Sequence, residues 1–186
     1  DITDFLKAGE NELVIRVQDF GNDASYPHGK QGKPWYANVG GIWQTVYLEA
    51  ATPLRIESVH LSPDLANKRF LVSGRIGGAA FEPGCSLRAY AKGHNEAVFS
   101  QNPTALTFTG EIAVPWLTPW SPAEPTLQEF EWRLACNGQI DAVRTYAGLR
   151  EIARAKLPGA EFESLTLNGR PIYIRGVLVQ GYNAQG

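Results

Sequence analysis

Apolar and polar residues that alternate with a period of two are the feature that most constrains how this chain can fold. The clearest example lies near 129–136, where Phe130, Trp132, Leu134 and Cys136 alternate with Glu129, Glu131 and Arg133. Such alternation indicates a strand with one face in a core and the other in water, as in antiparallel sheets. Helical periodicity is not sustained in any segment. The pattern therefore predicts an all-β fold, with a β-sandwich over most of the chain.

The same alternation divides the chain into parts. Residues 1–50 are predicted to contain two strands, one of them at 12–17, on either side of a long loop. Residues 51–149 contain roughly seven short strands separated by turn signals such as Asn137-Gly138, which is the number that one sandwich domain needs. We therefore expect a domain boundary near residue 50 and one complete sandwich after it.

The last part, residues 150–186, differs in kind. A linker is followed by a predicted hairpin at 165–171 and then by a nearly continuous apolar run at 172–179. Such a run is expected of a parallel strand that is buried on both faces and has neighbours on both sides. The chain also contains no methionine and begins inside a strand pattern, so we expect it to be part of a longer protein.

The two cysteines, Cys85 and Cys136, both lie among alternating strand residues. A buried thiol behaves there as a small hydrophobic side chain. We favour two buried free thiols over a disulfide, and the disulfide stays open because the redox compartment is not known.

Charge and motif content exclude several function classes. The chain has 17 basic and 19 acidic residues, well mixed, which gives no electrostatic basis for binding nucleic acid or an anionic membrane. No apolar run is long enough to span a bilayer. The three histidines do not have metal-ligand spacing, and phosphate-loop and dinucleotide motifs are missing. We expect no metal and no cofactor.

Five segments carry a further signal when they are taken in order. They are Asp-Ile-Thr at 1–3 with Gly-Glu-Asn-Glu-Leu-Val-Ile-Arg-Val at 9–17, Gly-Ile-Trp-Gln-Thr-Val-Tyr-Leu-Glu at 41–49, Pro-Trp-Ser-Pro at 119–122, Gly-Leu-Arg-Glu-Ile at 148–152, and Leu-Asn-Gly-Arg-Pro at 167–171 with Ile-Arg-Gly-Val at 174–177. In this order and at these separations they resemble motifs of the family 2 glycoside hydrolases, the group that is similar to β-galactosidase and β-glucuronidase.

The resemblance implies an architecture for the longer protein. Residues 1–50 would be the end of a jelly-roll sugar-binding domain, and residues 51–149 an immunoglobulin-like sandwich. Residues 150–186 would be a linker and the first strand of a catalytic TIM barrel. Thr45 stands where related β-galactosidases have an aspartate that contacts sugar and a sodium ion, so that ligand is not carried over.

The activity that the resemblance implies is retaining hydrolysis of O-glycosidic bonds in carbohydrates, with β-galactosides favoured. That chemistry uses two carboxyl groups about 5–5.5 Å apart. In this family both are glutamates on later barrel strands, and no position here matches them. We therefore expect the chain alone to be inactive. A homo-oligomeric parent enzyme stays open.

Three candidate substrate-binding residues lie near the end of the chain. Barrel active sites form at the carboxyl ends of the strands, which places Gln180 and Tyr182 at the rim of the site. Arg175, inside the apolar run, is expected to be buried with a carboxylate partner, because an unpaired buried charge is costly. It would either brace the region of the nucleophile or form a packing ion pair, and the residues favour neither reading.

The loop from Asp19 to Gly41 supplies two more candidates, Trp35 and Tyr36. Their flat rings, beside hydrogen-bonding groups, suit carbohydrate recognition, and loops on rigid sandwiches often carry function. The favoured alternative is that large aromatic residues such as Trp35 and Trp43 pack between domains.

Two other functions compete with the enzyme reading. The chain could be a stand-alone carbohydrate-binding or adhesive module, which would have no use for the apolar run at 172–179. It could also be an immunoglobulin-like interaction domain. That reading is weaker, because Trp116 and Trp120 come too late between the cysteines to be the core tryptophan of the third strand.

Overall fold

The computed structural model describes residues 2–19, 40–42, 44–78 and 84–178. The chain forms two compact units, and each is described here by itself. The larger unit is Glu49–Ile174, and the smaller one comprises Asp1–Leu48 and Arg175–Gly186. The domain boundaries predicted at residues 50 and 149 stay predictions.

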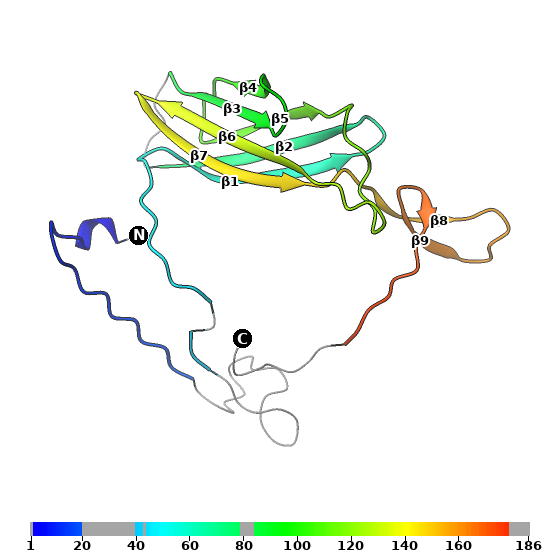
Figure 1. Cartoon of the computed structure of the whole chain (residues 1–186), viewed down its shortest axis with the longest axis horizontal. Coiled ribbons are helices and arrows are strands. Elements are labelled where there is room, and N and C mark those ends of the chain that lie inside the picture. The colour runs from blue at the N-terminus through cyan, green and yellow to red at the C-terminus, as the bar shows by residue number, and fades with distance from the viewer. Residues whose placement is uncertain (1, 20–39, 43, 79–83, 179–186) are drawn as a thin grey trace. The chain divides into compact units, whose positions relative to one another are not determined.

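The larger unit contains a sandwich of two antiparallel sheets (Figure 1). Its strands are β1 Arg55–Asp64, β2 Arg69–Gly77, β3 Ser86–Ala91, β4 Ala97–Gln101, β5 Thr107–Ala113, β6 Gln128–Cys136 and β7 Gln139–Ala147. One sheet has the order β1-β2-β5 and the other the order β4-β3-β6-β7. This confirms the predicted all-β, immunoglobulin-like sandwich. Strand β4 pairs with β3, whereas in antibody constant domains the fourth strand joins the first sheet.

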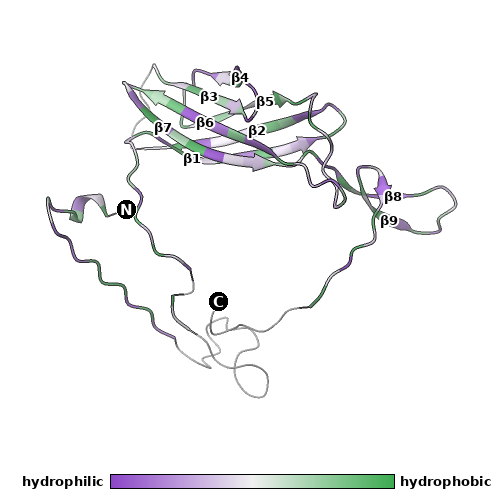
Figure 2. Cartoon of the chain, in the orientation of Figure 1, coloured by the Kyte–Doolittle hydropathy of each residue, from purple (hydrophilic) through white to green (hydrophobic). Residues whose placement is uncertain are grey.

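The core lies between the sheets, where the alternation in the sequence predicted it. Along β6, Phe130, Trp132 and Leu134 are buried to within 1% of complete burial, and Figure 2 shows hydrophilic and hydrophobic residues alternating along β6 and β7. The Trp132 ring lies 5.4 Å from that of Phe99 and 6.2 Å from that of Phe108. Its Nε1 donates a hydrogen bond to Thr145 Oγ1 at 2.9 Å, so the buried indole has no unpaired donor.

This aromatic cluster requires a glycine opposite it. Gly74 in β2 pairs with Phe108 in β5, and the Phe108 ring covers the position that a Cβ on Gly74 would take. The same Cβ would lie 2.5 Å from the Ser58 carbonyl oxygen of β1, which is backbone and cannot turn away. The close approach of ring and strand therefore depends on the missing side chain.

We expect Gly74→Ala to lower the free energy of unfolding by about 1–3 kcal/mol, the usual cost of overpacking a core. Urea unfolding followed by tryptophan fluorescence measures it. The control is Ser73→Ala on the exposed face of the same strand, which should stay within about 0.5 kcal/mol of the wild type. Equal stability of the two variants would contradict the tight contact.

The expectation of free thiols is wrong, because Cys85 and Cys136 form a disulfide. Strands β3 and β6 pair with Ser86 opposite Ala135, so the next residues outward are the two cysteines. Their Cα atoms lie 4.4 Å apart, close to the spacing of about 4.5 Å at the narrow positions of an antiparallel pair. Composition alone did not reveal that the two residues face each other.

Replacing both cysteines by alanine is expected to lower stability by about 2–4 kcal/mol, because a cross-link restricts the unfolded chain. The cysteines are separated by 51 positions in the sequence, which sets the size of the closed loop. Reducing the wild type should bring it to the level of the double variant. A reductant that left the unfolding midpoint of the wild type unchanged would contradict the cross-link.

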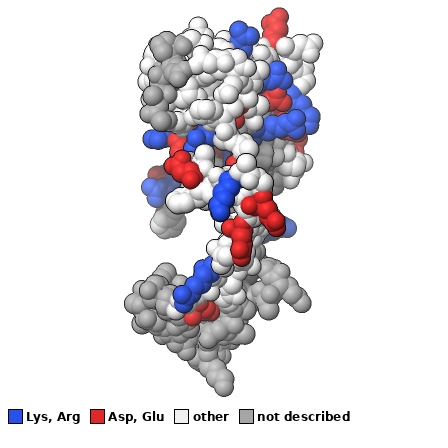
Figure 3. Space-filling view, turned by 90° about the vertical axis from the view of Figure 1, so that its left-hand side faces the viewer, with Lys and Arg blue, Asp and Glu red and all other residues white. Residues whose placement is uncertain are grey.

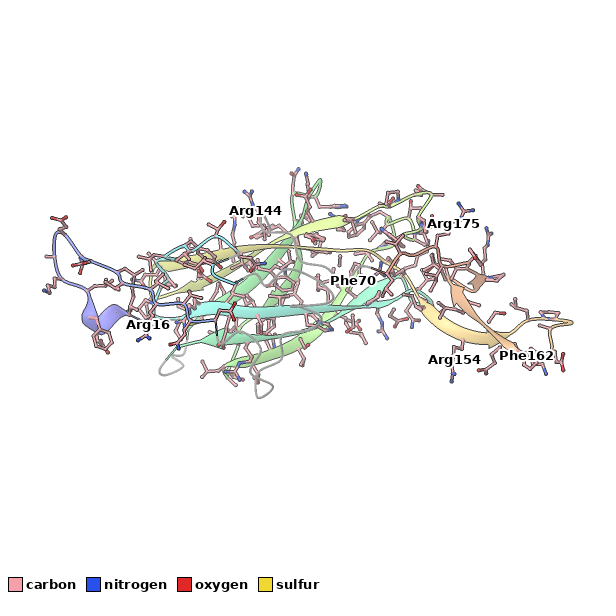
Figure 4. All side chains as sticks on the ribbon, turned by 90° about the horizontal axis from the view of Figure 1, so that it is seen from below. Arg16, Phe70, Arg144, Arg154, Phe162 and Arg175 are labelled. Atoms are coloured by element: carbon pink, nitrogen blue, oxygen red, sulfur yellow. A yellow bond between two sulfur atoms is a disulfide. The ribbon has the colours of Figure 1, made fainter. Side chains whose placement is uncertain are left out.

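A second, smaller sheet follows the sandwich. Its strands are β8 Ile152–Lys156, β9 Glu163–Leu167 and β10 Arg170–Pro171, in the order β10-β9-β8. Asn168 and Gly169 join β9 to β10 with φ of 52° and 74°, as a two-residue hairpin turn requires, which confirms the hairpin predicted at 165–171. Arg154 on β8 forms an ion pair with Glu163 of β9 at 3.7 Å, and Phe162 in the β8–β9 loop is exposed (Figure 4).

The strands predicted at 12–17 and 172–179 are not found in the described residues. The only regular element of the smaller unit's described part is the 3₁₀ turn η1, Thr3–Phe5. Leu13 is 54% exposed and Val177 is 89% exposed. No described strand supplies either segment with the ladder of hydrogen bonds that a strand needs.

Candidate functional site

Three loops of the larger unit meet around Trp120, in the segment between β5 and β6. The Trp120 amide donates a hydrogen bond to the Leu149 carbonyl oxygen at 2.8 Å. Gly148 lies against the indole, since a Cβ there would be 3.1 Å from the Trp120 Cβ. The Arg150 guanidinium lies 4.8 Å above the ring, a cation–π distance. The Trp120 ring is therefore partly covered by the chain that leaves β7.

Asn168, in the turn between β9 and β10, ties the hairpin to the same place. Its Nδ2 donates to the Trp120 carbonyl oxygen at 3.0 Å, and its Oδ1 accepts from the Glu151 amide at 2.9 Å. Its own amide donates to the Glu151 carbonyl oxygen at 2.8 Å. One side chain thus links the loop before β6, the segment after β7 and the hairpin. We call this set of contacts the Trp120–Asn168 junction.

The contacts of the junction hold the fold together, and none of them involves a group that could react with a substrate. Leu149 is fully buried beside the junction, and the hydrogen bonds use backbone atoms and one neutral amide. Three of the segments that carry the family resemblance, at 119–122, 148–152 and 167–171, come together here. Their shared role is to fix how the chain leaves the sandwich.

Removing the Asn168 side chain is expected to loosen the hairpin while the sandwich stays folded. Asn168→Gly is the test variant, because glycine keeps the left-handed backbone at φ 52° and loses only the two side-chain bonds. Amide hydrogen exchange should speed up at Glu151 and across β9 by about tenfold, since each bond is worth about 1 kcal/mol. Amides of β6 serve as the internal control. Unchanged exchange at Glu151 would show that the contacts do not hold the hairpin.

From the sequence, Asn168 is predicted to be a turn residue of the hairpin at 165–171. Its side-chain partners lie 17 and 48 positions away, at Glu151 and Trp120. An Asn-Gly pair predicts a tight hairpin turn, but no local pattern predicts such distant partners. The only available signal was that all three segments belonged to the family resemblance.

The five candidate substrate-binding residues are not brought together by the described structure. Trp35, Tyr36, Gln180 and Tyr182 lie outside the described residues. Arg175 is exposed and forms no ion pair with any described residue, and its expected burial beside a carboxylate stays a prediction. The missing strand pairing explains the exposure, because only a paired sheet would bury it. Its role toward a substrate stays a prediction.

Five carboxylates of the sandwich form surface ion pairs: Glu57, Asp64, Glu111, Glu129 and Glu131. Arg133, and after it Arg144, hold the pKa of Glu131 below its ordinary value. Hydrogen bonds from Asn67 and Arg69 lower the pKa of Asp64. A catalytic acid needs the opposite shift. Figure 3 shows acidic and basic side chains intermingled on the face in view.

Two further features of the described residues bear on function. Within the four described ranges, no group of three or more His, Cys, Asp or Glu residues could hold a metal ion. No helix in the described part of the chain is long and apolar enough to cross a membrane.

Comparison with known proteins points to one enzyme class. No protein-family model matches the chain, and no curated protein matches it. Among solved structures, a β-glycosidase from Bacteroides vulgatus is similar with a TM-score of 0.57 and 25% identity, over 77% of this chain and 19% of that one. The fold is one that a glycoside hydrolase contains. β-Glucuronidase 3 from Bacteroides uniformis shares the fold with a TM-score of 0.52 and 23% identity, over 74% of this chain and 17% of that one.

The chain therefore spans less than a fifth of the length of these two glycoside hydrolases.

Proposed function

We propose that this chain is a non-catalytic portion of a retaining β-glycosidase of glycoside hydrolase family 2, with β-galactosides as the favoured substrates. The observation that carries the proposal is the likeness to the Bacteroides vulgatus β-glycosidase, which extends over 77% of the chain. The order of the five resembling segments supports the same family. The proposal leaves open whether the parent enzyme is a homo-oligomer.

The Trp120–Asn168 junction gives this portion a task. A sandwich beside a catalytic domain contributes by fixing the direction in which the chain enters that domain. Here one backbone bond, one cation–π contact and the bonds of Asn168 fix the exit from β7. Arg175, Gln180 and Tyr182 lie between 7 and 14 positions after Asn168 and are the proposed contacts to sugar, together with Trp35 and Tyr36 of the earlier loop.

The proposal implies that the chain by itself cleaves nothing. Retaining hydrolysis needs a nucleophile and an acid whose pKa is raised. Asp64 and Glu131 are shifted the other way, and Glu129 is paired with Lys92 at 2.6 Å. Catalysis would come from carboxylates elsewhere in a longer protein.

The test compares a longer protein that contains this sequence with the 186-residue chain alone. Both are assayed on 4-nitrophenyl β-galactoside, β-glucuronide and β-glucoside. We expect the longer protein to hydrolyse the galactoside fastest and to release the β-anomer first, as retention requires, and the chain alone to be inactive.

Each other outcome changes a defined part of the proposal. Faster cleavage of the glucuronide would change the proposed substrate from a β-galactoside to a β-glucuronide, and the proposed glycosidase activity would stand. First release of the α-anomer would remove the retaining mechanism. A longer protein that binds glycans and hydrolyses none of the three would favour the alternative, a carbohydrate-binding or adhesive module.

A further inference from the structure

An exposed tryptophan beside a histidine lies at the end of the sandwich where β3 stops and β6 starts. The rings of Trp116 and His94 are 4.0 Å apart between centroids, with a tilt of 38°. Trp116 is 41% exposed. Neither residue belongs to the Trp120–Asn168 junction or to the candidate residues of the sequence analysis.

Trp116 is presented by a turn between two buried anchors. The Leu117 amide donates to the Val114 carbonyl oxygen at 3.0 Å, which closes a four-residue turn. Pro115 occupies the position of that turn in which its fixed φ is favourable. Val114 and Leu117 are 0% and 5% exposed, so the turn is fastened to the core on both sides. The tryptophan stands at its corner.

The indole is also held in one orientation. Its Nε1 donates to Gln128 Oε1 at 3.1 Å. Gln128 is only 7% exposed, and its Nε2 donates to the Lys92 and Glu129 carbonyl oxygens at 3.2 and 3.0 Å. A buried amide with every group paired is therefore used to fix the ring of an exposed residue. A core position could have been filled more simply by an apolar side chain.

His94 is positioned by a second turn. Its amide donates to the Ala91 carbonyl oxygen at 3.0 Å, and Gly93 between them has φ of 89°, which a side chain would strain. The preceding Lys92 amide donates to the Glu129 carbonyl oxygen at 2.9 Å, which joins this turn to the start of β6. Two independent turns thus converge on one aromatic pair.

We propose that Trp116 and His94 form a binding site for a pyranose ring of a glycan. The apolar face of the sugar would pack on the indole, and its hydroxyl groups would reach the His94 ring beside it. An apolar ring with a few placed polar groups is the usual make-up of a small-ligand site.

The fixed ring favours a rigid ligand, because little rotamer freedom is lost on binding. The choice of a carbohydrate over another rigid ring rests on the proposed function. The description of the site itself does not depend on that function.

The experiment is a titration of the full 186-residue chain, labelled with ¹⁵N, followed by NMR. The probes are cellotetraose, xylotetraose and β-1,4-galactotetraose. We expect at least one to shift the Trp116 indole N–H and the His94 amide together, with a Kd on the order of 1 mM, as one stacked ring allows. Trp116→Ala should weaken binding by about tenfold or more, the loss of about 1.4 kcal/mol.

Two further variants keep the test specific. Tyr146→Ala removes an aromatic residue that is 71% exposed on β7 and should bind like the wild type. Gln128→Met keeps the size of the buried side chain and frees the indole, so binding should weaken although Trp116 is present. Variants are compared only when their β6 amide shifts match those of the wild type.

Three results would overturn the proposal. One is the absence of shifts at Trp116 with all three sugars at about 20 mM, far above the expected Kd. Another is unchanged affinity in Trp116→Ala. The third is protection of Trp116 from hydroxyl-radical oxidation in a longer, sugar-free protein, which would show that another protein segment covers the ring. Because binding is measured without hydrolysis, these results are distinct from failure of the proposed enzyme function.

Discussion

The packing of Phe99, Phe108 and Trp132 between the two sheets is the interaction on which the rest of the structure depends. The three rings come from β4, β5 and β6, so they join both layers at once. Their size forces a glycine at position 74, and the hydrogen bond from Trp132 to Thr145 fixes β7 beside β6. The ends of β6 and β7, where the loops converge, are placed by this core.

The sequence predicted most of the sandwich because burial on one face of a strand leaves a local trace. The alternation along 129–136 and the turn at Asn137-Gly138 are both features of neighbouring residues, and both are confirmed. The failures concern partners. Residues 12–17 carry the same alternation, yet no described strand pairs with them, and Cys85 and Cys136 are opposite each other only through the register of β3 with β6.

The same distinction explains how much of the site was predictable. The motif segments at 119–122, 148–152 and 167–171 could be identified in the sequence. Their contact with one another could not be predicted from it. The contacts that join them run from Asn168 across 17 and 48 positions, and such contacts follow from the packed fold rather than from any period in the sequence. Periodicity in the sequence indicates which residues are buried. It carries no information about which distant loop supplies the hydrogen-bond partner of a polar group.

The loop between β5 and β6 shows how one segment can use two tryptophans in opposite ways. Trp120 is held through its backbone, and its ring is partly covered by Gly148 and Arg150. Trp116 is held through its indole N–H, which leaves part of the ring in solvent. A ring that is covered by the protein stabilises the fold, whereas a ring that is fixed and uncovered leaves its dispersion energy available to a ligand. The position of the fixing hydrogen bond, on backbone or on indole, separates the structural tryptophan from the binding one.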